Sequence, residues 1–124
     1  MNPRVIIITQ GLSRIVDPLC NRHNVVGIIE SKPRKKPKLF FVIIRYLYQL
    51  IKFNKQSLSS YAKKKNIPYF YMENGSDTVL ENWVKQKNPD IIVIHSMSQL
   101  LKDNIFTIPK YKTINLHPSL LPQY

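Results

Sequence analysis

Apolar residues gather in five short runs along the chain, at residues 4–9, 24–30, 67–72, 90–95 and 111–117. The runs at 4–9 and 90–95 are rich in Ile and Val and are apolar at successive positions, as central strands of a parallel sheet are. Segments with helical features separate the runs, and they are more polar except for 39–53, which is mostly apolar. Strand and helix alternating in this way predict an α/β fold of the Rossmann-like class, with a mostly parallel sheet of about five strands and helical crossovers.

The segments between the strands predict five helices. The first begins near Ser13 or Asp17, and the other four cover 39–53, 57–65, 78–88 and 100–106. The helix at 78–88 carries the clearest signals. Thr78 and Glu81 have capping-box spacing, and one face of the helix is expected to be apolar. That face would consist of Val79, Leu80, Trp83 and Val84.

The charge of the chain is unevenly distributed. The formal net charge is +12, yet the residues from Ser31 to Met72 hold eleven of the 19 basic residues and no acidic one. The rest of the chain is close to neutral. We therefore expect a near-neutral domain covering residues 1–124, with a basic insert at about 31–65, and any binding of a polyanion would concern that insert.

The cysteine content and the hydropathy of the chain bear on its cellular compartment and on disulfide and metal-site chemistry. The one cysteine, Cys20, excludes an intramolecular disulfide and a cysteine-based zinc site, and it suits a reducing, cytoplasmic environment. There is no run of 18 apolar residues and no recognisable secretion signal at the amino terminus. The three histidines are too scattered along the sequence to suggest a metal site.

The last strand carries the strongest candidate chemistry. Alternation places Ile114 and Leu116 on one side of it, and Asn115 and His117 on the other. Pro118 ends the strand, so His117 falls at the carboxyl edge of the sheet, where ligands bind in open parallel sheets. An amide there can stabilise an oxyanion, and an imidazole can exchange protons near neutral pH. Spacing alone also allows a hydrogen-bonded pair without a chemical role.

Ten contiguous residues at this point resemble a known active-site signature. Residues 115–124 read Asn-Leu-His-Pro-Ser-Leu-Leu-Pro-Gln-Tyr. They are similar to the signature of the 10-formyltetrahydrofolate-dependent formyltransferases, which act on methionyl-tRNA, glycinamide ribonucleotide or nucleotide-linked amino sugars. The resemblance extends back through residues 90–94 and 108–111 and implies transfer of a formyl group from the folate to a primary amine, without a metal.

The resemblance also implies roles for individual residues. Asn115 and His117 would stabilise the tetrahedral intermediate, with His117 transferring the proton. The pterin pocket would be lined by the residues after the fourth strand, namely Ser96, Met97, Ser98, Gln99, Leu100 and Leu101. The loop beside the acceptor amine would contain Ser119, Leu120, Leu121, Pro122 and Tyr124.

The family's third catalytic residue, an Asp well downstream of the His, is absent from these 124 residues. Because a catalytic unit that lacks one member loses several orders of magnitude in rate, we expect the chain as given to be nearly inactive, and its sheet to be incomplete at the carboxyl end. A non-catalytic remnant that binds folate or a partner, and an anion-binding module, are the alternatives. Reading the sequence beyond Tyr124 would separate a cut chain from a remnant.

Three other features bear on substrates and partners. The turn Gln10-Gly11-Leu12-Ser13 lies where parallel-sheet proteins often hold phosphate, but it departs from the loop of glycinamide ribonucleotide formyltransferases, so an amino sugar nucleotide or methionyl-tRNA is favoured as acceptor. His95 is a candidate for a binding role at the end of the fourth strand. The basic insert is a solvated surface, a contact for a polyanion such as tRNA, or, least favoured, a membrane contact. The tRNA-contacting residues would be Lys32, Arg34, Lys35, Lys36 and Lys38.

Overall fold

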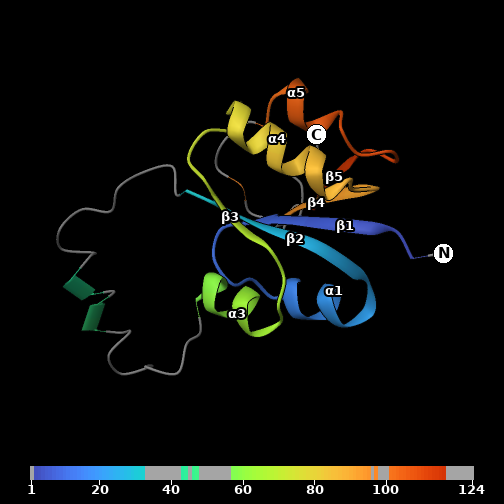
Figure 1. The fold of residues 1–124 in the computed structure, drawn as a ribbon. Coiled ribbons are helices and arrows are strands. Elements are labelled where there is room, and N and C mark those ends of the chain that lie inside the picture. Colours follow the sequence, from blue (N-terminus) through green and yellow to red (C-terminus); the bar gives the residue numbers. More distant parts are fainter. Residues whose placement is uncertain are drawn as a thin grey trace, which may run out of the picture.

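The computed structural model describes residues 2–32, 43–44, 46–47, 57–95, 97 and 101–116. Strands and helices alternate along it, as the apolar runs predict (Figure 1). The elements in chain order are β1 (Arg4–Thr9), α1 (Val16–Arg22), β2 (Asn24–Ser31), α3 (Leu58–Lys64), β3 (Tyr69–Met72), α4 (Thr78–Lys87), β4 (Ile91–His95), α5 (Asp103–Phe106) and β5 (Thr113–Leu116).

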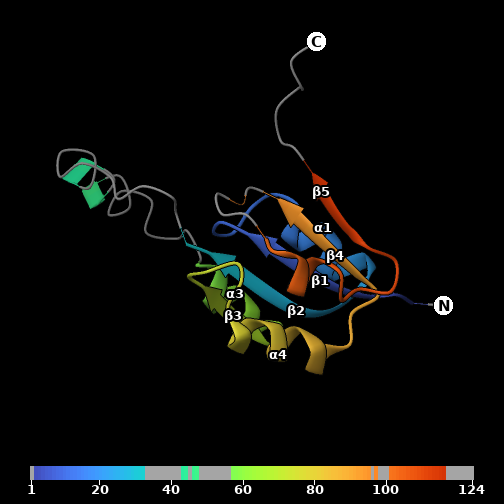
Figure 2. The ribbon, with the colours of Figure 1, turned by 90° about the horizontal axis from the view of Figure 1, so that it is seen from above.

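The five strands form one parallel sheet in the order β3-β2-β1-β4-β5. The predicted α/β class with helical crossovers is confirmed. β1 lies at the centre and β5 at one edge (Figure 2). Successive strands are added on one side of β1 up to β3 and on its other side from β4 onwards, so the strand order reverses between β1 and β4. In open α/β sheets, ligands bind beside the carboxyl ends of the strands at such a switch point.

Helices cover both faces of the sheet. Figure 1 shows α1 and α3 side by side on one face and α4 and α5 on the other. Alternate strand residues supply two separate cores. Ile6, Ile8 and Ile29 pack towards α4 and α5, whereas Val5, Ile7 and Ile28 pack towards α1 and α3. Because β1 is buried on both faces, apolar side chains are needed at successive positions along it, and this explains its continuous apolar run.

The beginning of α4 differs from the prediction. Asp77, rather than Thr78, is the N-cap, and its carboxylate accepts a hydrogen bond from the Val79 amide at 2.9 Å. Glu81 does not take part in a capping box. Its carboxylate contacts Lys85 at 2.8 Å and accepts a bond from Asn104 at 2.7 Å, and these contacts lower its pKa.

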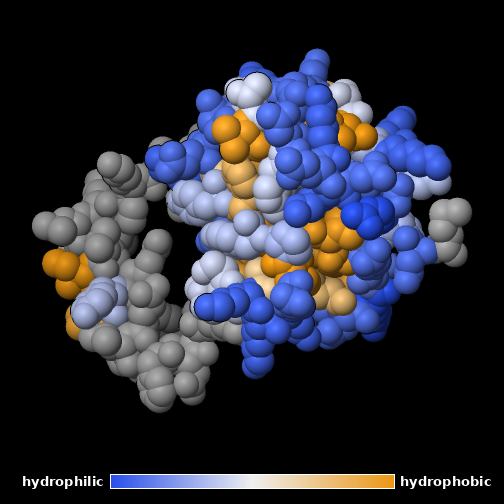
Figure 3. Space-filling view, viewed as in Figure 1, coloured by the Kyte–Doolittle hydropathy of each residue, from blue (hydrophilic) through white to orange (hydrophobic). Residues whose placement is uncertain are grey.

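The apolar face of α4 is narrower than predicted. Leu80 and Val84 are fully buried and Trp83 packs against the same core, but Val79 is 63% exposed. Val79 lies in the first turn, two residues after the N-cap Asp77. The prediction for Val79 was therefore wrong. Figure 3 shows the surface of the molecule from the same side as Figure 1, with hydrophilic residues over much of the helical layers.

A bulge in β2 accommodates Trp83. Val5 pairs with Val25 while Ile6 pairs with Gly27, so Val26 is an extra residue on β2. A Cβ atom on Gly27 would lie 2.7 Å from Cη2 of Trp83. Glycine at this position therefore lets the indole ring of α4 approach the backbone of the sheet.

Arg4 fastens the carboxyl end of α4 to the beginning of β1. Its guanidinium donates to the Lys87 carbonyl at 2.7 and 3.0 Å and to the Asn88 carbonyl at 3.1 Å. The Asp90 carboxylate accepts from the Arg4 amide at 2.8 Å. The guanidinium bonds satisfy carbonyls at the end of α4 that have no partner within the helix.

The other helix predictions hold to different degrees. α1 begins at Val16 with Pro18 in its first turn, and α3 lies inside the range predicted for it. α5 is shorter than predicted, since only Asp103–Phe106 is helical. The predicted helix at 39–53 lies largely outside the described residues, and those described there, 43–44 and 46–47, are helical and exposed. In the part of the chain that the structure describes, no helix is both long and apolar enough to cross a membrane.

Candidate active site

Asn115 lies where the last strand meets the carboxyl edge of the sheet. In the β4–β5 register it pairs with Ile94, and it is exposed. Since Ile94 packs in the core beneath α4 and α5, Asn115 lies on that face of β5. Its amide is thus available to solvent beside a buried strand. His117 lies outside the described residues, as do Ser119, Leu120, Leu121, Pro122 and Tyr124.

His95 lies on the opposite face of the sheet from Asn115. It pairs with Thr9 on one side and with Leu116 on the other, and only 9% of it is exposed. Its neighbour Val93 packs towards α1 and α3, and alternation places His95 on that same face. The structure therefore does not bring His95 and Asn115 together on one face.

Two apolar residues that follow β4, Met97 and Leu101, pack against the core. Met97 is partly buried against the core beneath α4 and α5, and Leu101 is 6% exposed within it. The Lys102 amide donates to the Gly75 carbonyl at 3.2 Å, which ties the end of this segment to the turn before α4. Of the six residues predicted to line the pterin pocket, Ser96, Ser98, Gln99 and Leu100 lie outside the described residues.

The turn after β1 is closed by its own hydroxyl groups. Thr9 is fully buried, and its hydroxyl lies 3.1 Å from Oγ of Ser13 and 3.3 Å from the Gly11 carbonyl. Gly11 has φ of +70°, a conformation that glycine adopts without strain. Apart from Gly11 and its two chain neighbours, no heavy atom of the described residues lies within 4 Å of the Cβ position at Gly11.

Two polar features at the end of β2 were missed by the sequence interpretation. Ser31 is 1% exposed and its hydroxyl has no hydrogen-bond partner among the residues that the structure describes, which is uncommon for a buried polar group. The neighbouring Glu30 accepts a short hydrogen bond from the hydroxyl of Tyr69. Burial and this bond raise the pKa of Tyr69, so the phenol remains a donor. Neither feature has a local sequence signal, because each depends on β2 and β3 lying side by side.

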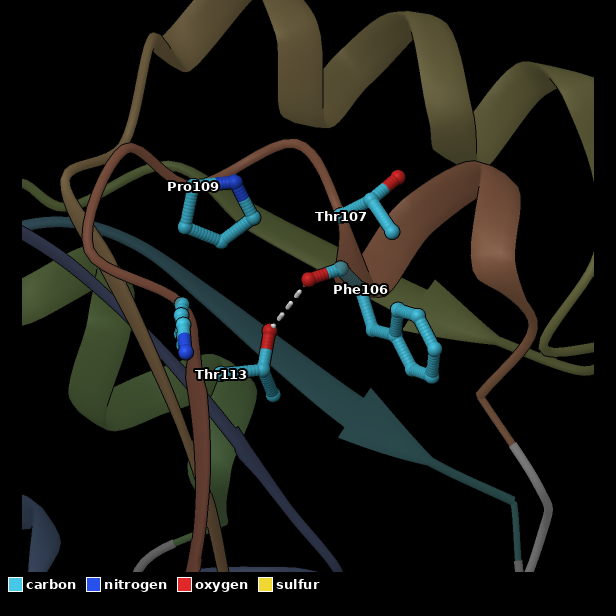
Figure 4. A pocket seen from close by; sticks show the side chains of 5 residues that line it. Phe106, Thr107, Pro109 and Thr113 are labelled. Carbon is cyan, nitrogen blue, oxygen red and sulfur yellow. Dashed lines mark hydrogen bonds between the residues drawn. The ribbon is translucent and has the colours of Figure 1, made fainter.

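A cavity of about 400 Å³ opens at the other end of β5. It is lined by Phe106, Thr107, Pro109, Lys112 and Thr113 (Figure 4). The hydroxyl of Thr113 donates to the Phe106 carbonyl at 2.9 Å across it. Thr113 is two residues before Asn115, so both lie on the same face of β5. The cavity therefore lies at the amino end of the strand that carries Asn115, and its lining includes neither Asn115 nor Leu101.

The described residues offer no metal centre. Within ranges 2–32, 57–95 and 101–116, no group of three or more His, Cys, Asp or Glu side chains could hold an ion. Of the predicted tRNA-contacting residues, Lys32 is described and exposed, and its amide donates to the Met72 carbonyl at 3.0 Å. The other four, Arg34, Lys35, Lys36 and Lys38, lie outside the described residues.

The family model named Formyl transferase matches residues 44–124, which is more than half of the chain and includes β4, β5 and Asn115. The chain belongs to the formyl transferase family. A methionyl-tRNA formyltransferase from Sulfurihydrogenibium sp. is 37% identical over 108 residues, and one from Clostridium acetobutylicum is 44% identical over 64 residues.

Solved structures of formyltransferases share the fold of this chain. A phosphoribosylglycinamide formyltransferase from Anaplasma phagocytophilum has a TM-score of 0.62 at 17% identity, and one from Streptococcus pneumoniae has 0.61 at 11% identity. These cover 98% and 97% of this chain, but 52% and 59% of their own length. At such low identity the likeness concerns the fold alone.

This formyl transferase chain spans a minor part of its sequence relatives. The match to the Sulfurihydrogenibium protein covers 84% of this chain and 30% of that protein, and the match to the Clostridium protein covers 51% and 21%. The residues that the family model matches, 44–124, contain β3, β4 and β5 with the candidate site.

Proposed function

We propose that this sheet carries the donor side of a formyl transfer reaction, in which 10-formyltetrahydrofolate supplies the formyl group to a primary amine. The observation that supports the proposal most directly is the position of Asn115. It is an exposed amide at the carboxyl end of an edge strand, inside the region that matches the formyl transferase family. An amide at that edge can donate a hydrogen bond to a carbonyl oxygen that becomes negatively charged.

The proposed step requires groups that bind the donor, stabilise charge and move a proton. The acceptor amine attacks the formyl carbon, a C–N bond forms, and the bond from that carbon to the folate nitrogen breaks. The N–H of Asn115 would stabilise the charge on the formyl oxygen. The imidazole of His117 would take the proton from the amine and return one to the folate nitrogen.

The residues after β4 fit a binding site for the donor. Met97 and Leu101 pack into the same core as Ile94, the register partner of Asn115. Small-molecule sites are mostly apolar with a few polar groups, and the partly exposed Met97 and the amide of Asn115 are groups of these two kinds. We propose that Ser96–Leu101 line the pterin site and that 119–124 contact the acceptor, with an amino sugar nucleotide or methionyl-tRNA as the favoured acceptors.

A single-turnover assay tests the proposal. The chain at high concentration is mixed with 10-formyltetrahydrofolate and an amine acceptor, and the formylated product is quantified by mass spectrometry. Asn115→Ala should lower the rate by about 100-fold or more, as loss of an oxyanion donor does. The matched control is Asn82→Ala, since Asn82 is an exposed amide on α4.

Donor binding and turnover give separate readouts. Titration calorimetry should detect binding of 10-formyltetrahydrofolate to the wild-type chain and to both variants. Absence of donor binding, or a rate that Asn115→Ala leaves unchanged, would contradict the proposal. Because the 124 residues lack the family's downstream Asp, we expect formyl transfer by this polypeptide alone to be slow, in a single turnover as well as in multiple turnover. Rapid multiple turnover would contradict only that expectation.

A further inference from the structure

The cavity beside the amino end of β5 has the size of a site for a small organic molecule. Its volume of about 400 Å³ is at the lower end of the range of small-molecule sites, which is roughly 300–1,000 Å³. It lies between the last residue of α5, Phe106, and the first residue of β5, Thr113. We call it the β5 cavity.

Hydrogen bonds hold the walls of the β5 cavity in place. The hydroxyl of Thr113 donates to the Phe106 carbonyl at 2.9 Å, which joins β5 to the end of α5. The Lys112 amide donates to the Pro109 carbonyl at 3.3 Å and closes the turn between these elements. The Lys112 carbonyl accepts from the Ile92 amide of β4 at 3.4 Å. Because the walls are already fixed, a ligand loses little affinity to the ordering of the protein.

The lining of the β5 cavity is mainly apolar. The ring of Phe106 is 40% exposed and the ring of Pro109 is buried, and Figure 4 shows the two rings apart, with the bond between Thr113 and the Phe106 carbonyl between them. The hydroxyl of Thr107 donates to the Asp103 carbonyl at 2.5 Å, so both threonine hydroxyls already use their protons. A ligand would meet two rings and two threonine methyl groups.

Lys112 supplies one positive charge to this lining. Its side chain is exposed, and among the described residues its ammonium takes part in no ion pair. Residues 104–116 contain Lys110 and Lys112 and no acidic residue. The acidic residues next to the segment are Asp103 on α5 and Asp90, whose carboxylate accepts from an amide of β1 at 2.8 Å, and neither forms an ion pair with Lys112. The charge of Lys112 therefore favours a ligand with a negative group.

We propose that the β5 cavity binds a small aromatic monocarboxylate, with its ring against Phe106 and Pro109 and its carboxylate beside Lys112. An aromatic ring packs well against the face or edge of a phenylalanine. One cation in the lining matches one negative charge, and a second charge would be left without a partner among apolar groups. The cavity is at the amino end of β5 and Asn115 is at its carboxyl end, so this binding is separate from the proposed formyl transfer.

Titration of the isotope-labelled chain with 2-naphthoate, followed in amide NMR spectra, tests the proposal. The spectra report both the affinity and the place of binding. The amide signals of Thr107, Lys112 and Thr113 should shift and saturate, while those of Met97 and Leu101 should not. For a ligand of this size we expect a dissociation constant of about 0.1–1 mM. The neutral amide, 2-naphthamide, has a similar shape and should bind about two- to fivefold more weakly, because it lacks the charge.

Two variants and their matched controls test the contribution of each wall. Lys112→Gln should lower the affinity for 2-naphthoate about two- to fivefold and leave that for 2-naphthamide unchanged. Phe106→Ala should lower the affinity for both ligands about fivefold or more. The controls are Lys110→Gln and Tyr111→Ala. Lys110 and Tyr111 are exposed neighbours outside the lining, with the ammonium 5.2 Å from the ring centre, and each control should change either affinity less than about twofold.

Four results would overturn the proposal. They are the absence of saturable shifts at millimolar 2-naphthoate, shifts at Met97 and Leu101 instead of the cavity residues, equal wild-type affinity for the two ligands, and equal effects of Lys112→Gln and Lys110→Gln. The amide spectrum of each variant shows whether it is folded, and the exposed lysine pair decides the matter if Phe106→Ala is not. Since neither the folate donor nor a change at Asn115 is used, failure of this proposal and failure of the proposed function are distinguishable.

Discussion

Replacing Gly27 by alanine tests how closely α4 packs against the sheet. The new methyl carbon would lie 2.7 Å from Cη2 and 3.1 Å from Cζ3 of Trp83, and 3.5 Å from Cγ1 of Ile6. The indole ring cannot easily move aside, because it also packs against Phe70 with ring centroids 5.5 Å apart. Inserting a methyl group into such a contact costs about 1–3 kcal/mol.

Part of that cost is offset in the unfolded chain. Alanine has fewer unfolded conformations than glycine, and this favours folding by about 0.5–1 kcal/mol. We therefore expect Gly27→Ala to lower the free energy of unfolding by about 1–2 kcal/mol. For a domain of this size the midpoint of thermal unfolding should fall by about 4–10 °C, measured by circular dichroism.

A double-mutant cycle with Trp83→Phe tests the proposed cause. Phenylalanine lacks the outer indole ring that carries both contact atoms, so in that background the cost of Gly27→Ala should largely disappear, with a coupling of about 1–2 kcal/mol. Gly11→Ala is the control, since its cost comes from φ of +70° and should be independent of Trp83. A cost of Gly27→Ala that persists unchanged in the Trp83→Phe background would refute the explanation.

Local features of single residues support four further predictions. Arg4→Ala removes the guanidinium bonds to the end of α4 and should cost about 1–3 kcal/mol in urea unfolding, whereas Arg4→Lys should recover only part of it. Lys112 has φ of +96°, so Lys112→Gly should stabilise the protein by about 1 kcal/mol in the same assay. Because the folded state raises the pKa of Tyr69 through burial and Glu30, its contribution is present below the ordinary tyrosine pKa of about 10 and is lost as pH rises through the folded value. The urea midpoint of the wild type should therefore fall more steeply above about pH 10 than that of Tyr69→Phe. Ile114 is 47% exposed on the edge strand, and Ile114→Lys should reduce self-association measured by light scattering.

The first of these four predictions has a control within the chain, and each of the other three has a result that would contradict it. Lys85→Ala removes an exposed ion pair within one helix and should cost much less than Arg4→Ala. A destabilising effect of Lys112→Gly would show that its side chain contributes more than its backbone strain costs. If the urea midpoints of the wild type and Tyr69→Phe fell equally with pH, the pKa of Tyr69 would not be raised by folding. If Ile114→Lys self-associated as strongly as the wild type, the contact between copies would not involve the edge strand β5.

The sequence by itself determined the fold class and the position of the candidate site along the chain. Apolar residues on both faces of 4–9 and 90–95 require burial from both sides, and parallel strands with helices on both faces are the arrangement that provides it. Alternation in 113–117 placed Asn115 opposite Ile114 on the strand, and the pairing of β4 with β5 agrees with this.

Only the tertiary structure decided how these elements fit together. Capping-box spacing at Thr78 was misleading because Asp77, one residue earlier, offers a carboxylate to the same helix end, and Glu81 is drawn instead to Lys85 and Asn104. The role of Gly27 depends on a tryptophan 56 residues away, and α1 and α3 contact each other through a hydrogen bond from Tyr61 to Asp17, 44 residues apart. Local pattern reports which residues share a face of one element, whereas contacts between elements depend on packing that no local pattern encodes.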